Sequence, residues 1–484
     1  MTLLIDSNVF IAVEDHSTSS HVNGPAAAEL HRLAARLGHR IVISHGTRSD
    51  LLRAPDPLKG QRQRALDRYL VLSPVKDDPV LAAQFPAVRG PNDQADLEVG
   101  SAFATGVAHW LVTEDAKLRG RLQRAGHSDV FALTEAIEAL NSQLATPTAL
   151  PTVETVDAYE LDSHADIFTT LKADYDGFTH WWRTKVCAGN RKAIILGTAG
   201  APQGLCVPKL EHDRPHGLEG TVLKLCTFKV SDGFRGVARG ELLLQAAIET
   251  ARQHSVGTLY LEVLPDKEDL IVWLARFGFE VRPGHSTPRG EAVYVKHLIP
   301  PADRAPRHPL EHAIAHGPGH VLVHRPTAVP IQPTWHRQLF PQADQQGDLF
   351  TGLDACGNAI RKVYVCQSPT RYLDPGDTLL FVLTGTGDTR VTAIGVVEET
   401  LVTADAGQML GFTASRSVYS ADQIRQWCKV ETLAIRFRLD RVLNEQWPLA
   451  ELEEHGLLKS SPQSITRLKD GATAWVNDRL AESL

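Results

Sequence analysis

The fold of the middle of this chain is decided by the stretch Phe234-Arg-Gly-Val-Ala-Arg-Gly240-Glu-Leu-Leu-Leu244. It follows an apolar segment, Val222–Val230, that reads as a strand, and it opens a long apolar helix over Gly240–Gln253. A glycine-containing turn that enters a helix leaves backbone N–H groups unpaired at the positive end of the helix dipole. This strand, turn and helix therefore predict a binding site for a pyrophosphate.

The segments around this turn extend the pattern in both directions. Ala193–Leu196 predicts an earlier strand, Leu259–Val263 the next one, and Leu270–Phe277 a helix that ends at Gly278. Over residues 153–298 this order resembles the GNAT acyltransferase family, whose phosphate loop Arg235-Gly236-Val-Ala-Arg-Gly240 matches. The resemblance implies acetyl-CoA as the cofactor. It implies that the cofactor is bound by Leu225, Thr227, Val230, Arg235, Gly236, Val237, Ala238, Arg239, Gly240 and Glu241.

Two positions depart from the GNAT pattern and leave the acid–base chemistry open. Ala238 replaces the middle glycine of the loop, and Leu274 stands where many relatives carry a tyrosine that protonates the thiolate. Glu262 is a candidate base that acts through water and Tyr294 a candidate acid, with a structural role as the alternative for both. The aromatic residues of 174–182 are candidates for stacking on the acceptor or for core packing, and they include Tyr175, Trp181 and Trp182.

In the first segment, short apolar strands alternate with helical patterns, which predicts a parallel α/β sheet. Asp6 follows the strand Leu3–Ile5, and Asp115 follows Trp110–Thr113. Ligands of open parallel sheets bind at the carboxyl ends of the strands. If these two strands are neighbours, the two carboxylates lie about 5 Å apart and repel by roughly 3 kcal/mol at an effective dielectric constant of ~20.

Asp50, after the strand Ile41–Ser44, and Asp96, expected at the start of the helix Asp96–Gly106, add two further carboxylates. Such a cluster calls for a hard divalent cation, Mg²⁺ or Mn²⁺, with Asp6, Asp50, Asp96 and Asp115 as ligands. These residues resemble those of a PIN nuclease domain over residues 1–140, with Asp93 competing for the third place. The resemblance implies metal-dependent cleavage of single-stranded RNA by these same four catalytic carboxylates. The alternative is that the residues end strands and cap helices.

After residue 308, strands dominate, from Val321–His324 to Leu433–Leu439, with the turn Asp374-Pro-Gly-Asp377 among them. This region predicts a small β-barrel and resembles PUA-like domains of the ASCH/EVE group, which implies RNA binding. Exposed cations and an aromatic at a barrel mouth suit phosphates and bases, or they keep the barrel soluble. The candidates are Arg361, Lys362 and Tyr364. His308, His312, His316 and His320 are not expected to form a metal site, because Gly317-Pro318-Gly319 interrupts their helix.

The 484 residues, 43% hydrophobic and 22% charged, fit an α/β multidomain protein. Proline-rich seams at 142–153 and 299–309 predict three domains at 1–145, 150–299 and 308–484. The net charge of −7 gives no support to purely electrostatic binding of nucleic acid. The six cysteines form no Cys-x-x-Cys pair, Asp6 comes too early for a signal peptide, and no apolar run spans a bilayer. We therefore expect a cytoplasmic protein without a membrane partner.

Together these features predict an RNA-acting enzyme that joins a PIN-like ribonuclease to a GNAT-like N-acetyltransferase and a PUA-like module. Toxin-like, RNA-processing and RNA-modifying roles are the hypotheses, and tRNA is one candidate substrate. One alternative is a protein or small-molecule N-acetyltransferase with an inert PIN-like domain. The other is a non-enzymatic RNA-binding adaptor. The RNA, the acyl acceptor, an antitoxin partner and a homo-oligomeric state stay open.

Overall fold

The computed structural model describes residues 1–14, 23–55, 58–87, 89–144, 153–231, 239–301, 307–344, 359–385, 387–413, 416 and 418–482. These residues form two compact units. The first contains Met1–Pro147 together with Thr403–Glu431, and the second contains Thr148–Val402 together with Thr432–Leu484. No helix in the described part of the chain has the length and the apolar character that crossing a membrane requires.

The first unit is built on a five-stranded sheet in the order β3-β2-β1-β4-β5, in which all four pairs of neighbouring strands are parallel. This confirms the predicted parallel α/β sheet and places β1 and β4 side by side. Its elements are β1 Thr2–Ile5, α1 Ser7–Glu14, α2 Gly24–Arg36, β2 Arg40–Ile43, α3 His45–Leu51, α4 Leu58–Leu66, β3 Leu70–Val71, α5 Pro79–Ala82, α6 Pro91–Ala104, β4 Trp110–Val112, α7 Ala116–Arg124, β5 Val130–Phe131 and α8 Leu133–Asn141.

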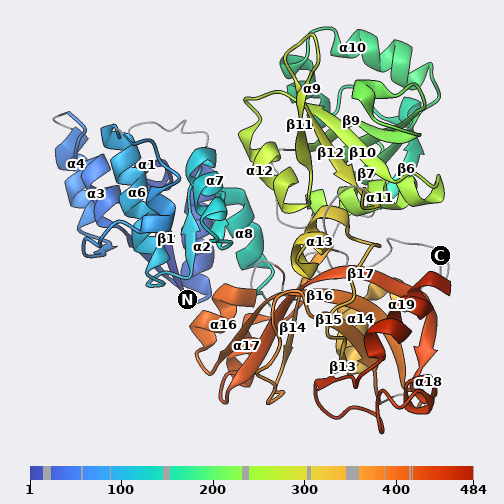
Figure 1. Ribbon diagram of the computed structural model, residues 1–484. Helices are drawn as coiled ribbons and strands as arrows, with labels where there is room; N and C mark the ends of the chain where they lie inside the picture. The colour runs from blue at the N-terminus through green and yellow to red at the C-terminus, as the bar shows by residue number, and fades with distance from the viewer. Residues whose placement is uncertain are drawn as a thin grey trace. The chain divides into compact units, whose positions relative to one another are not determined.

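The helices α16 (Ala406–Thr413) and α17 (Ala421–Trp427) complete this unit, although they come late in the chain, as their orange colour shows (Figure 1). The indole N–H of Trp110 in β4 donates to the carbonyl of Gly411 in α16 over 2.9 Å. The backbone N–H of Ala421 donates to the carbonyl of Gln143 over 2.8 Å. The parallel sheet therefore obtains part of its packing from residues that lie about 300 positions away.

The second unit contains a seven-stranded sheet in the order β11-β12-β10-β9-β8-β7-β6. Its pairs are antiparallel except for the parallel pair β9 and β10. Its elements are β6 Val153–Asp157, α9 Asp166–Asp174, α10 Phe178–Trp181, a π-helical turn Trp182–Cys187, β7 Lys192–Thr198, β8 Ala201–Glu211, β9 Val222–Val230, α11 Arg239–Gln253, β10 Thr258–Val263, α12 Glu268–Arg276, β11 Glu280–Ser286 and β12 Ala292–His297.

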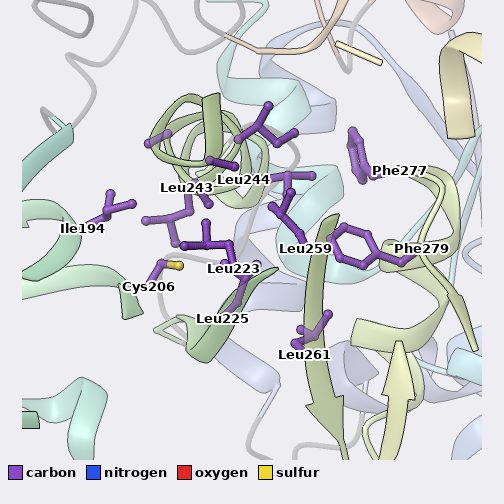
Figure 2. Packing of buried hydrophobic residues seen from close by; sticks show 14 of the residues in the cluster. Ile194, Cys206, Leu223, Leu225, Leu243, Leu244, Leu259, Leu261, Phe277 and Phe279 are labelled. Atoms are coloured by element: carbon purple, nitrogen blue, oxygen red, sulfur yellow. The ribbon is translucent and has the colours of Figure 1, made fainter. Parts of the chain in front are cut away.

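Helices cover both faces of this sheet, which explains why its central strands are apolar on both sides. Leu243 and Leu244 of α11 pack on Leu223, Leu225 and Leu259 of the sheet (Figure 2). The residues that alternate with these point to the opposite face, where α9 and α10 contribute to a second cluster with β7 and β8. We call the face of the sheet on which α11 packs the α11 face, and the face covered by α9 and α10 the opposite face.

A second, six-stranded mixed sheet follows in the order β14-β17-β16-β15-β13-β18. Its elements are α13 Pro309–His316, β13 Thr327–Ile331, α14 Pro333–Leu339, β14 Arg361–Cys366, β15 Thr378–Leu383, β16 Arg390–Thr403, β17 Thr432–Pro448, α18 Leu449–Glu454, β18 Thr466–Arg467 and α19 Ala472–Glu482. Its closure into a barrel stays a prediction.

The expected strand Val321–His324 is wrong. Arg325 (φ 45°) and Pro326 end that segment before β13, and Val323 is buried without being part of a strand.

Candidate functional site

The parallel strands β9 and β10 separate soon after they meet. They pair only at Leu223 with Leu259 and at Lys224 with Tyr260. Beyond Lys224, β9 continues along β8 alone, and β10 continues along β12. A β-bulge sits at the point of separation, because Leu225 pairs with Pro208 and Phe228 with Cys206, which leaves two residues of β9 opposite one of β8. Beyond Lys224, the β9 edge that faces β10 is therefore no longer paired with β10.

The predicted cofactor residues on β9 lie along this edge. The Leu225 side chain is buried in the core of the α11 face, and Val230 packs against the same core. Thr227 is buried and belongs to the bulge, together with Cys226. Side chains of this kind can line an apolar channel, while the polar contacts of the edge come from the main chain.

The predicted phosphate turn leads from this edge into α11. Arg235, Gly236, Val237 and Ala238 lie outside the described residues. Arg239 and Gly240 form the start of α11. A β-carbon on Gly240 would lie 3.0 Å from a ring atom of Trp273 in α12, so a close approach of the indole explains this glycine. Phe228 lies beside the same indole, with the ring centroids 5.4 Å apart.

The side chain of Glu241 does not face the cofactor site that the sequence predicts. It is 2% exposed, and its Oε2 accepts a hydrogen bond of 3.0 Å from the backbone N–H of Arg361. Only the main chain of Glu241 is left to take part in binding at the start of α11. The main-chain role expected for Glu241 stays a prediction, while its carboxylate connects α11 to the C-terminal sheet.

Glu262 and Tyr294 lie on opposite faces of the sheet. Tyr294 is the cross-strand partner of Leu261, so the two side chains point to the α11 face, whereas Glu262 pairs with Val293. Tyr294 packs against the core of the α11 face, and burial raises the pKa of its phenol. The structure therefore does not bring these two predicted catalytic groups together.

The carboxylate of Glu262 already has partners on both oxygens. Lys224, the last residue of β9 that pairs with β10, has its Nζ 2.7 Å from Oε2 of Glu262, two residues beyond that pair. His216 Nε2 lies 2.8 Å from Oε1. This histidine, which the sequence analysis did not single out, contacts Glu262 directly, and the expectation that Glu262 acts as a base through water stays a prediction. The only signal for this histidine in the sequence was the turn composition, Pro215 and Gly217 on either side of His216.

The aromatic residues expected on the acceptor side are mainly core residues. Trp182 is buried and stacks on Phe178, with the centroids 5.9 Å apart and the planes at 21°. Trp181 and Tyr175 are partly buried against the same cluster on the opposite face. Trp182 is therefore a core residue, which is the alternative to stacking on the acceptor that the sequence left open.

In the first unit, three of the four predicted carboxylates lie within electrostatic range of one another. Burial raises the pKa of Asp6, and the charge of Asp115 adds to the effect. Burial raises the pKa of Asp96 to about 7, and the charges of Asp6 and Asp115 contribute next. The carboxylate of Asp50, the fourth, is paired with Arg53 one helical turn away.

The start of α6 also differs from the prediction. The helix begins at Pro91 after Gly90, because proline suits the first helical position. Asp93 is therefore the acidic residue of the first turn, and Asp96 lies in the second turn. Arg121 lies 3.2 Å from Asp93 and 3.8 Å from Asp96, and it supplies part of the positive charge that the sequence analysis assigned to a metal ion.

The donor set does not fit the divalent cation that the PIN resemblance implies. The two oxygens of Asp6 accept hydrogen bonds from Ser7, Asn8 and Thr113, and Asp115 caps α7 through the N–H of Leu118. Across the described residues, no group of three or more His, Cys, Asp or Glu side chains is arranged to hold a metal ion. The four-carboxylate metal site is therefore not assembled as predicted.

The C-terminal candidates for RNA contacts are buried. Arg361 forms a bidentate pair with Glu398, Lys362 donates to the carbonyl of Leu339 over 2.8 Å, and Tyr364 donates to the carbonyl of Pro330 over 2.8 Å. The three side chains are at most 9% exposed. The sequence placed these residues at an exposed barrel mouth, but five of the six residues of β14 are buried.

Three of the four histidines, His312, His316 and His320, come together in spite of the interrupted helix, whereas His308 caps α13. α13 ends at His316, and the following turn brings His320 Nδ1 to 3.1 Å from His312 Nε2. Burial lowers the pKa of all three imidazoles, that of His312 to about 4.

No protein-family model and no curated protein matches this sequence. Solved structures similar to parts of the chain include a GNAT-family acetyltransferase from Staphylococcus aureus, at 14% identity over 30% of this chain and 99% of that chain (TM-score 0.25). They include the PaiA N-acetyltransferase from Thermoplasma acidophilum in complex with coenzyme A, at 12% identity over 30% and 99% (TM-score 0.24). They also include the ASCH protein from Zymomonas mobilis, at 13% identity over 32% and 94% (TM-score 0.24). These TM-scores are all below 0.5, so the functional proposals rest on this chain's own residues.

Proposed function

We propose that residues 153–298 transfer an acyl group from acyl-CoA, acetyl-CoA in the first instance, to an amine. The observation that carries this proposal is the separation of β9 from β10 after two residue pairs. Where β9 is no longer paired with β10, its edge can offer main-chain N–H and C=O groups to an extended, amide-containing chain such as the pantetheine arm of coenzyme A. The start of α11 follows β9 and supplies the positive end of a helix dipole for phosphates.

Hydrogen exchange measured with and without acetyl-CoA tests this proposal directly. Bound acetyl-CoA should slow exchange of the amides of β9 beyond Lys224, because they gain partners. The amides of β7 provide the internal control, since β7 is paired with β6 and with β8. Absence of binding heat in calorimetry, or protection confined to other strands, would contradict the proposal.

A bulky substitution of Gly240 is a poor test of phosphate binding. Any side chain there meets Trp273, so lost affinity would be mixed with lost packing. The double variant Gly240→Ala/Trp273→Phe separates the two effects, because the smaller ring makes room for the methyl group. If the double variant is as stable as wild type and still binds acetyl-CoA more weakly, the start of α11 contributes to binding.

RNA binding by the C-terminal sheet is a second candidate function, and one contact favours it. The guanidinium of Arg467 lies over the ring of Tyr372, with 4.7 Å from Cζ to the ring centroid, and Tyr372 is 40% exposed. An exposed aromatic beside a cation suits a base and its phosphate. These two residues replace Arg361, Lys362 and Tyr364 as the candidate contacts.

Filter binding with labelled tRNA tests this candidate. Tyr372→Ala should weaken binding, since stacking on an aromatic ring contributes about 1–3 kcal/mol per base. Tyr159→Ala is the matched control. Tyr159 is also exposed, but it follows β6 of the seven-stranded sheet and is not part of the proposed RNA-binding region. Equal affinities of both variants and wild type would exclude Tyr372.

RNA binding without acetyl-CoA binding would select the non-enzymatic adaptor, and acyl transfer without RNA binding would select a protein or small-molecule acceptor.

RNA cleavage by the first unit is not part of this proposal, because its carboxylates do not fit a divalent ion. We expect Mn²⁺ to leave the melting temperature of the first unit unchanged. If Mn²⁺ instead raised the melting temperature of the wild type but not that of Asp6→Asn, a metal site at Asp6 and a PIN-like function would have to be considered again.

A further inference from the structure

A histidine on the opposite face of the seven-stranded sheet lies against the mouth of the diverging strands. His216 belongs to the short helical turn Pro215–Gly217 in the connection between β8 and β9. Its Nε2 lies 2.8 Å from Oε1 of Glu262, and Oε2 of the same carboxylate lies 2.7 Å from Lys224 Nζ. Glu262 is two residues beyond the last pair that joins β9 and β10, so the imidazole is held where the strands begin to separate.

The backbone holds this imidazole in a conformation that few side chains adopt. His216 has a φ of 52° and Arg214 a φ of 52°, both in the left-handed region that residues with a β-carbon avoid. Arg282 in β11 stabilises the turn, because its Nε donates to the carbonyl of His216 over 2.8 Å and its Nη2 to that of Gly217 over 3.2 Å. The ring of His216 also packs edge-on against Tyr260, with the centroids 5.5 Å apart. Such a conformation persists only where the surroundings determine it, and it is frequent at functional sites.

The contact with Glu262 fixes which nitrogen carries the proton. A carboxylate only accepts hydrogen bonds, so Nε2 of His216 is the donor and Nδ1 of the neutral ring holds the free lone pair. None of the described residues donates a hydrogen bond to Nδ1. The imidazole is therefore oriented by an acid on one side and able to take a proton on the other, which is the arrangement of a general base with its orienting carboxylate.

We propose that His216 accepts the proton of the acceptor amine during acyl transfer, with Glu262 as its positioning residue. This inference rests on the proposed function. The nitrogen of the neutral amine forms a bond to the acyl carbon, and the bond from that carbon to sulfur breaks with its electron pair remaining on sulfur. The amine proton moves to Nδ1 of His216 and is then available to the thiolate, so that the products are the amide and the free thiol. The acceptor accordingly approaches from the opposite face, across the sheet from α11.

The variant His216→Asn tests the role of the ring while keeping the turn, because asparagine tolerates the left-handed region. His285→Asn is the matched control, since it removes a second imidazole of the same face whose centroid lies 6.2 Å from that of His216. Acetyl-CoA affinity is measured by calorimetry on the full chain. Thiol release from acetyl-CoA is measured with spermidine, with an aminoacyl-tRNA pool and with water alone as acceptor.

We expect His216→Asn to bind acetyl-CoA within a factor of two of wild type and to release thiol about 100-fold or more slowly. Free imidazole should restore part of that rate in His216→Asn and none in His285→Asn, after subtraction of the enzyme-free rate. Nitrogen-detected NMR should assign the Nε2–H tautomer to the histidine signal that disappears in His216→Asn. Glu262→Leu should change that signal, because the ring loses its acceptor.

The outcomes separate this inference from the function on which it rests. No acetyl-CoA binding by wild type would refute the proposed function itself. Binding with thiol release that His216→Asn leaves within a factor of two would refute only the role of His216. Loss of binding and release together in His216→Asn, without rescue by imidazole, would assign the residue a structural role. Wild-type binding without release above the enzyme-free rate for all three acceptors would also overturn the inference.

Discussion

The carboxylate of Glu241, in the first turn of α11, accepts a hydrogen bond of 3.0 Å from the backbone N–H of Arg361 at the start of β14. The two groups are 120 residues apart and both are buried. Arg361 and Arg438 both pair with Glu398 in the same region, and the Glu241 charge favours the charged form of Arg438. The helix that follows the diverging strands is thereby connected to the C-terminal sheet within one unit.

Removal of this carboxylate should weaken the second unit. Glu241→Ala leaves a buried N–H without an acceptor and takes a negative charge from two buried arginines, which should cost about 1–3 kcal/mol in the free energy of unfolding. Urea denaturation measures the change. Glu249→Ala on the same helix is the control, because its pair with Arg252 at 3.7 Å is partly exposed and should contribute little. Equal stabilities of the two variants would contradict a role for Glu241.

Lys296 should be among the most sensitive positions of the same unit. Its Nζ donates to the carbonyls of Phe277 (2.8 Å), Ala315 (3.0 Å) and Ile314 (3.1 Å), and its side chain is 1% exposed. Burial lowers the pKa of this amine well below its usual value. Lys296→Met preserves the length of the chain but leaves three carbonyls unpaired, so we expect a loss of about 2–4 kcal/mol by urea denaturation. Lys192→Met, at an exposed pair with Asp157, is the control and should change stability little.

Asp96 should make the first unit less stable as the pH rises from about 4 to 7. Its pKa is raised to about 7 in the folded chain, whereas an unfolded aspartate ionises near pH 3.9. Between these values the unfolded state has lost the proton that the folded state keeps, so the free energy of unfolding falls with pH and levels off above about 7. After allowance for partial solvent exposure, the loss should be on the order of 2 kcal/mol.

The variant Asp96→Asn should remove this slope, and the exposed Asp67→Asn should keep it. Thermal unfolding between pH 4 and 8 provides the measurement. A wild-type stability that rises over this range would show that Arg121, at 3.8 Å, outweighs the burial of Asp96 and the charges of Asp6 and Asp115.

The first unit should depend on the segment 403–431. A β-carbon on Gly411 would lie 2.7 Å from the β-carbon of His109, so Gly411→Val should separate α16 from β4 and break the hydrogen bond from Trp110. We expect a destabilisation of about 1–3 kcal/mol, the usual cost of overpacking. Hydrogen exchange of the β4 amides should accelerate in this variant. Gln408→Ala, at an exposed position of the same helix, should leave the exchange unchanged.

The sequence predicted local structure well where one pattern dominates. The alternation of apolar strands with helices predicted the parallel sheet of the first unit and the places of Asp6 and Asp115 after two of its strands, whereas the fold showed that these strands are neighbours. Bounds were less accurate where a local signal competed with the pattern. Pro91 moves the start of α6 by five residues from the expected Asp96, and Arg325 with Pro326 prevents the strand expected at Val321–His324.

The candidate site could be predicted only in part, because its contacts join residues far apart in the chain. Glu262 was found from its place on a strand, but its partner His216 is 46 residues away in a turn without periodicity. Asp50 was grouped with the other carboxylates from its order in the chain, whereas a hydrogen-bonded arginine one turn away pairs with it. The presence of an acidic residue at the end of a strand does not reveal which side chain will pair with it in the folded chain.

The amino-acid sequence by itself determined where strands and helices form, since hydrophobic period, turn residues and helix starts are local properties. Only the tertiary structure decided how far β9 and β10 stay together, which face each side chain occupies and which groups are paired. Register, bulges and long-range contacts arise from the packing of the whole unit. The separation of those two strands, with Lys224, Glu262 and His216 at its mouth, is for this reason visible in the fold and not in the sequence.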